Sequence, residues 1–124
     1  NSDLVCLQSH IYFRAIVEQL TGPPANKLQS YELTEEQWLL AGAVEEVLLL
    51  FQNLTDLFSQ AEVPLIVEAL PMLEVLEVAL EGAREDADAP NVVCVAAQAA
   101  LLLLDKYSVF TNECELYQIA IGKL

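Results

Sequence analysis

Hydrophobic positions recur at spacings of three and four over residues 34–58, and this pattern predicts a long amphipathic helix with a polar opposite side. Thr34 and Gln37 are spaced as a capping box, and Glu35 and Glu36 fall where a helix N-terminus favours negative charge. We expect the chain to be organised around this helix, because its wide apolar side needs packing partners along its whole length. The apolar positions are Trp38, Leu39, Ala41, Val44, Leu48, Phe51, Leu54, Leu57 and Phe58.

An earlier helix is predicted over residues 2–20, where apolar side chains form a stripe and Ser2 is suited to the N-cap. The following Thr-Gly-Pro-Pro sequence should end it, with Gly22 in the left-handed C-cap conformation and Pro23 unable to continue the hydrogen-bond ladder. A loop to about Gln29 then leads to the long helix.

A third helix is predicted from Pro64, a residue suited to the first helical position, to Glu81. Pro71 interrupts this pattern, so we expect a kink near Val67 or a break into two helices. The small and acidic residues 82–90 predict a mobile loop.

Residues 91–107 are hydrophobic nearly all round, which predicts a helix buried on most sides, either as the central member of a bundle or against another domain. Thr111 or Asn112 could cap a short last helix containing Leu116, Ile119 and Ala120. With short connections between these segments, we predict an all-α fold: one domain over residues 1–124, with four main antiparallel helices and a short C-terminal helix.

The charge and hydrophobic content of the chain argue against binding to nucleic acids and membranes. The hydrophobic share is 55%, and the formal net charge is −14 with five basic residues scattered along the chain. Because clustered Lys and Arg provide most nucleic-acid affinity, we expect no direct binding to DNA and none to anionic membranes. The longest uncharged stretch, residues 91–104, is too short to span a bilayer. No basic segment precedes an apolar run at the start, so we expect no signal peptide.

Three distant cysteines provide neither a complete disulfide framework nor a zinc pattern, which favours a reducing, intracellular compartment. The chain does not begin with Met, which suggests a fragment or a processed product.

Three features could carry chemistry, and for each we favour a structural role. Cys6 and His10 share a helix side and could offer two metal ligands, but a site needs three or four, so we expect a partly packed histidine beside a core cysteine. Trp38 could stack on a base, yet its apolar helix position favours the core. Glutamates that line one helix side should form a solvated acidic face: Glu74, Glu77, Glu81 and Glu85.

Catalysis by a nucleophile needs a base held nearby, and the chain has one histidine, isolated glycines and no G-x-S-x-G sequence. We therefore predict no catalytic, cofactor-binding or metal-binding residue in this chain, no cofactor and no enzymatic activity of its own.

The order of several motifs resembles hAT-superfamily DNA transposases. The first residues, NSDLVCLQSHIYFRAIVEQL, resemble the segment that begins with the last two residues of their R-W-N-S motif. The segment LTEEQWLLAGAVEEVLLLFQNLTDLF resembles their L-T-x-x-x-W stretch, with matches at Leu33, Thr34, Trp38, Leu48 and Phe51. Pro64 and Pro71 match a later segment in spacing, with Leu65 in place of the usual Thr. The last segment resembles the family's K-Y…Y-x-I-A-x-x-L stretch, with matches at Lys106, Tyr107, Tyr117, Ile119, Ala120 and Leu124.

This resemblance implies the helical insertion within an RNase H-like catalytic domain. The family's two catalytic Asp residues precede the insertion and its catalytic Glu follows it, so the resemblance places no catalytic residue in this chain. It implies a nuclear protein whose insertion packs on the catalytic core and supports assembly, in an active transposase or a domesticated descendant.

A second hypothesis remains open from the residues themselves. A stand-alone acidic helical module could offer an apolar groove to a partner helix. Under both hypotheses, the expected partner is a protein or a second copy that binds through apolar helix faces.

Overall fold

The computed structural model describes residues 2–59, 69–120 and 122, and within these ranges the chain is all-helical, without strands. The predicted fold class is thereby confirmed, and the arrangement is consistent with a helical bundle. Contacts group the chain into two compact units, residues 1–49 and residues 50–124, and each is described by itself. The expectation of one domain over residues 1–124 stays a prediction.

The first unit begins with two helices, α1 (Ser2–Tyr12) and α2 (Arg14–Thr21), where one helix was predicted. Phe13 separates them because its backbone, at φ −95° and ψ 23°, leaves the helical region. The hydrogen-bond ladder nevertheless continues across it: the Phe13 N–H donates to the Ser9 carbonyl, and the Val17 N–H donates to the Phe13 carbonyl. Ser2, predicted as the N-cap, already lies inside α1.

The predicted stop after α2 is confirmed, but its mechanism differs from the prediction. Gly22 has right-handed helical angles, with φ −68°, so the left-handed cap expected there is wrong. The Asn26 side-chain amide donates instead to the Leu20 carbonyl at 3.0 Å. Two short 3-10 turns, η1 (Pro24–Asn26) and η2 (Gln29–Tyr31), carry the chain onward, and Lys27 between them adopts the left-handed conformation at φ 56°.

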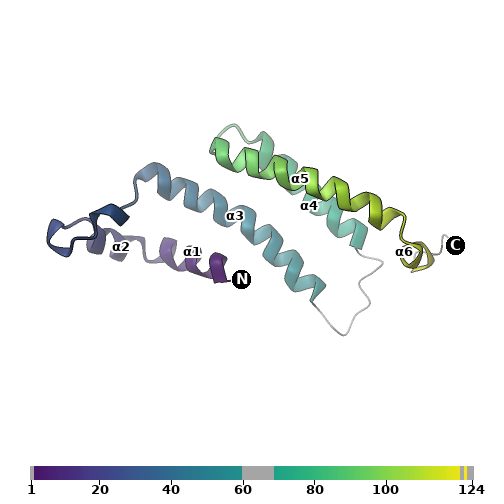
Figure 1. The fold of residues 1–124 in the computed structure, drawn as a ribbon, viewed down its shortest axis with the longest axis horizontal. Helices are drawn as coiled ribbons and strands as arrows, with labels where there is room; N and C mark the ends of the chain where they lie inside the picture. Colours follow the sequence, from purple (N-terminus) through teal and green to yellow (C-terminus); the bar gives the residue numbers. More distant parts are fainter. Residues whose placement is uncertain (1, 60–68, 121, 123–124) are drawn as a thin grey trace. The chain divides into compact units, whose positions relative to one another are not determined.

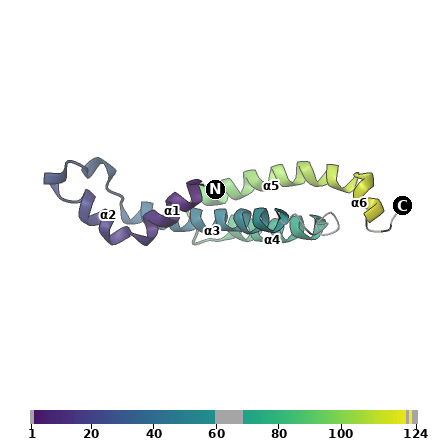
Figure 2. The same ribbon diagram turned by 90° about the horizontal axis from the view of Figure 1, so that it is seen from below.

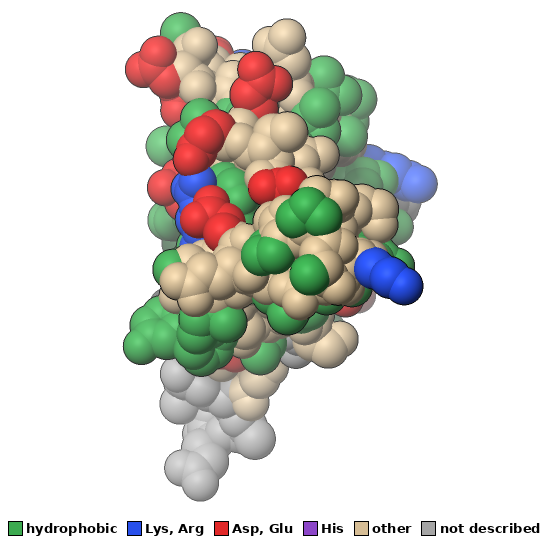
Figure 3. Space-filling view, turned by 90° about the vertical axis from the view of Figure 1, so that its left-hand side faces the viewer, with side chains coloured by type: hydrophobic (Ala, Val, Ile, Leu, Met, Phe, Trp, Pro, Cys, Tyr) green, Lys and Arg blue, Asp and Glu red, His purple; other side chains and the backbone are tan. Residues whose placement is uncertain are grey.

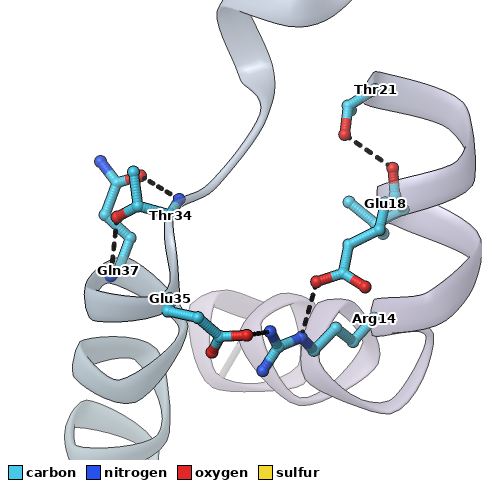
Figure 4. Close-up of polar contacts among 7 residues, drawn as sticks. Arg14, Glu18, Thr21, Thr34, Glu35 and Gln37 are labelled. Atoms are coloured by element: carbon cyan, nitrogen blue, oxygen red, sulfur yellow. Dashed lines mark hydrogen bonds and ion pairs between the residues drawn. The ribbon is translucent and has the colours of Figure 1, made fainter. Parts of the chain in front are cut away.

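The long helix α3 (Glu35–Phe58) begins at the predicted capping box. The Gln37 N–H donates to the Thr34 hydroxyl at 3.2 Å, and the Gln37 side-chain carbonyl accepts from the Thr34 N–H at 2.9 Å, as Figure 4 shows. Two of the backbone N–H groups that a helix start leaves without partners are thus satisfied by two residues three apart.

The expected burial of α3 along its length is wrong. Trp38 is buried, whereas Leu39 and Phe58 are exposed and most other apolar side chains of α3 are half-buried. Within the first unit, the known ring contacts to α3 come from His10 and Arg14 and both fall on Trp38, close to the helix start.

The second unit is organised around α4 (Ala69–Glu85) and α5 (Asn91–Asn112), which lie side by side as an antiparallel pair in both Figure 1 and Figure 2. Their packing is the most extensive between any two of the described elements. The core of this pair is contributed by apolar side chains of both helices: Met72, Leu76, Leu80, Val93 and Ala97.

The boundaries of α4 differ from the predicted ones. The helix continues through Gly82 to Glu85, so the predicted loop over residues 82–90 is shortened to residues 86–90. Arg84 explains the extension, because its guanidinium donates to the Gln98 side chain on α5 at 3.1 Å and to Glu85 at 2.9 Å. Pro71 lies in the first described turn of α4, and the predicted start at Pro64 and the kink near Val67 fall outside the described residues.

The predicted last helix is present as α6 (Glu115–Ala120), but its start differs. Thr111 and Asn112, proposed as its cap, belong to the end of α5. The Cys114 carbonyl accepts the first backbone hydrogen bond of α6, from the Gln118 N–H at 3.1 Å.

Candidate functional site

The two sides of α5 differ sharply in burial. Val93 and Ala97 are buried against α4, and Ala100, Leu101 and Leu104 on the same side are half-buried. The opposite side is exposed, so the prediction that this chain buries α5 on most sides as the central member of a bundle is wrong, and burial against another domain stays a prediction. Hydrophobicity all round a helix predicts burial but does not say whether the same chain provides the cover.

We define the α5 face as the exposed apolar stripe on this opposite side, which comprises Val92, Val95, Ala96, Ala99, Leu102 and Leu103. These positions recur at spacings of three and four, so they form one continuous surface. At its C-terminal end, the Lys106 ammonium lies 5.6 Å from the centroid of the Tyr107 ring. Contiguous exposed apolar surface of this kind is typical of binding sites on proteins.

The outer side of α4 carries the glutamates that were predicted to form a solvated acidic face. All four are exposed, as predicted: Glu74, Glu77, Glu81 and Glu85. Next to this strip, Val75 and Val78 are exposed as well. The α4–α5 pair therefore presents an acidic strip on one helix and an apolar stripe on the other.

In the first unit, Trp38 is the centre of a cluster of aromatic and charged side chains. It is 5% exposed, and its predicted core position is confirmed. The His10 ring stacks on it with centroids 5.7 Å apart, and the Arg14 guanidinium carbon lies 5.0 Å from the indole centroid. The Trp38 indole N–H is buried and has no acceptor among the described residues. A buried donor without an acceptor costs about 1–3 kcal/mol.

Arg14 connects α2 to the start of α3. Its guanidinium donates to Glu18 at 2.9 Å and also to Glu35, the first residue of α3, as drawn in Figure 4. The hydrogen bonds to Glu18 and then to Glu35 raise the pKa of Arg14 above its ordinary value. The cluster of Trp38, His10 and Arg14 therefore holds together elements of the first unit with contacts that do not resemble a catalytic arrangement.

Cys6 and His10 do not form the arrangement that either hypothesis described. Cys6 is exposed, so the expected core cysteine is wrong, and His10 stacks on Trp38. Within the described ranges, no group of three His, Cys, Asp or Glu side chains is placed to hold a metal ion. Cys6, Cys94 and Cys114 are all free thiols.

An open hollow of about 440 Å³ lies between α1 and α3 in the first unit. Its polar groups belong to side chains that offer no nucleophile paired with a base. We therefore assign no chemistry to it. The lining residues are Gln8, Ser9, Ile11, Tyr12, Phe13 and Glu45.

Charge and hydropathy complete the picture of the surface. Figure 3 shows acidic and hydrophobic side chains intermixed on one side of the molecule, in keeping with the net charge of −14. By length and composition alone, α3 is the one helix in the described part of the chain that could cross a membrane. The core helix of a soluble protein meets the same criterion, so this property carries little weight.

No protein-family model, no curated protein and no solved structure matches this chain. The α5 face is consequently the surface from which a function is argued. Sequence patterns missed it because they predicted the same helix to be buried. The signal that could have found it is the small size of Ala96 and Ala99 beside larger apolar residues.

Proposed function

We propose that this chain is a non-catalytic helical insertion domain of a hAT-type DNA transposase or a domesticated relative, which packs on the catalytic core and supports assembly. The observation that carries the proposal is the order and spacing of the motifs, above all Leu33-Thr34 followed by Trp38. Local structure supports it, because Thr34 caps α3 and Trp38 is the buried anchor of its first turn. Each of these residues has a structural role here.

A role in assembly is supported by the surface. The acidic side chains of α4 are exposed on a helix side, and the apolar side chains of α5 are exposed opposite the core. The parent enzyme would use metal-bound carboxylates from outside this segment to cut and join DNA. The segment itself would contribute packing, in the nucleus, with proteins as its partners and no direct contact to DNA, because its acidic surface repels phosphate.

The competing proposal is a stand-alone acidic protein-interaction module. The exposed α5 face favours it, since a long apolar helix side can serve as a docking site for a partner helix. Both proposals assign the chain a binding role, and they differ in what is encoded on either side of it.

The experiment that separates them is to determine the coding sequence on both sides of residues 1–124. The transposase proposal expects a preceding segment with strand patterns and two Asp residues and a following segment with a Glu. Co-expression of such flanking segments with residues 1–124 should then yield a complex that survives gel filtration in about 1 M salt, where charge pairs are screened. Flanks without these patterns would overturn the proposal in favour of the stand-alone module.

A further inference from the structure

We propose that the α5 face is a self-association surface, on which a second copy of this chain packs its own α5 in antiparallel orientation about a two-fold axis at Ala99. This inference deepens the proposed role in assembly and rests on it, because it names the partner and the surface. A symmetric contact of this kind uses the same patch on both copies, so the patch must be complementary to itself.

The sizes of the side chains meet that requirement. Reversing α5 about Ala99 places Ala96 opposite Leu102 and Val95 opposite Leu103. Each large side chain of one copy thus faces a smaller one of the other, and Ala99 meets its own counterpart at the centre. Small residues at the centre let two helix axes approach to about 8–10 Å, the distance at which helices pack.

Charge also favours a second copy. Lys106 continues the α5 face at its end, with Asp105 exposed one residue before it, and the loop at the other end of α5 carries the exposed residues Asp86 and Asp88. Antiparallel pairing brings the cation of each copy toward the acidic loop of the other. The four glutamates of α4 lie on the neighbouring helix, away from the contact.

The first test is sedimentation equilibrium of the whole 124-residue chain and two variants with the same substitution. Val95→Glu places a charge in the α5 face, and Val78→Glu places one on the outer side of α4, where the exposure is nearly equal, 69% against 68%. We expect dimers for the wild type and Val78→Glu, and a dissociation constant raised at least about tenfold for Val95→Glu. Circular dichroism should show that both variants keep their helix content, because both positions are exposed.

The second test locates the axis. In a background with Cys6, Cys94 and Cys114 replaced by Ser, Ala99→Cys should form an intermolecular disulfide under mild oxidation, and Val78→Cys should not. A monomeric wild type, an equal response of the two Glu variants, or cross-linking at position 78 instead of 99 would each overturn the inference. These outcomes leave the transposase proposal standing, since that depends on the flanking sequence.

Discussion

His10 lies stacked on Trp38, with ring centroids 5.7 Å apart and ring planes inclined by 27°. The contact joins α1 to the first turn of α3 within the first unit, and Arg14 covers the indole as well, at 5.0 Å. Trp38 is the buried residue of α3, and it receives both ring contacts, while the Arg14–Glu35 ion pair joins the same elements beside it.

Replacing Trp38 by Ala should lower the free energy of unfolding by about 3–5 kcal/mol, because it removes a large buried side chain and leaves a cavity. Trp38→Phe should cost less, because it also removes the buried N–H that has no acceptor among the described residues. Urea denaturation followed by circular dichroism measures both. Leu39→Ala is the control: this neighbour is 69% exposed and should change stability by less than about 0.5 kcal/mol. Equal losses at positions 38 and 39 would contradict the assigned core.

The capping box predicts a second contrast on α3. Thr34→Ala removes the acceptor of the Gln37 N–H and should cost about 1 kcal/mol. Thr55→Ala, in the interior of the same helix, should be neutral or stabilising by a few tenths of a kcal/mol. The Thr55 hydroxyl only donates back to the Phe51 carbonyl, which the helix ladder already uses. Denaturation midpoints of the two variants decide this, and an equal response would argue against the cap.

Arg14→Gln should destabilise the first unit, and the loss should shrink as NaCl is raised from about 0.05 M to about 1 M, because salt screens the pairs with Glu18 and Glu35. Lys27→Gln removes one positive charge at a residue with no ion pair among the described contacts, and its effect should not depend on salt.

The pH dependence of the Arg14 contribution follows from the direction of its pKa shift. Its pKa is raised in the folded state, so its contribution is complete below the ordinary pKa and is lost only as pH rises through the raised value. Between about pH 6 and pH 9 arginine stays charged, so the contribution of Arg14 to the free energy of unfolding should not change with pH. A loss from Arg14 deprotonation inside this range would contradict the arrangement.

Gly82 tests the extended end of α4, and Gly22, after α2, is the comparison. Gly82 lies inside the helix, and a Cβ built on it meets nothing within 4 Å, so Gly82→Ala should stabilise the second unit by about 1 kcal/mol. Gly22→Ala should bring no such gain, because its Cβ would lie 3.0 Å from the Glu18 carbonyl oxygen. Thermal unfolding compares the two. Destabilisation by Gly82→Ala would favour the loop that the sequence alone predicts at this position.

Features set by neighbouring residues could be predicted from the sequence, and those set by tertiary contacts could not. The start of α3 depends on Thr34 and Gln37, three residues apart, and it was predicted correctly. The helical conformation at Gly82 was not predicted, because Gly disfavours helices and the compensating Arg84–Gln98 contact comes from another helix.

Burial followed the same division. The apolar periodicity predicts Trp38 as a core residue, and this is correct because helices of the same chain cover it. It did not reveal the α5 face, because an apolar pattern is the same whether the cover comes from this chain or from another one.

The glutamates along α4 have a consequence for handling the protein. The α4–α5 pair carries the apolar α5 face on one helix and the acidic strip on the other. In dilute buffer, like-charged copies repel over roughly 30 Å, and in concentrated electrolyte that reach shrinks to about 3 Å. Raising the salt concentration therefore weakens the repulsion between copies, and both their association and their solubility should depend on it.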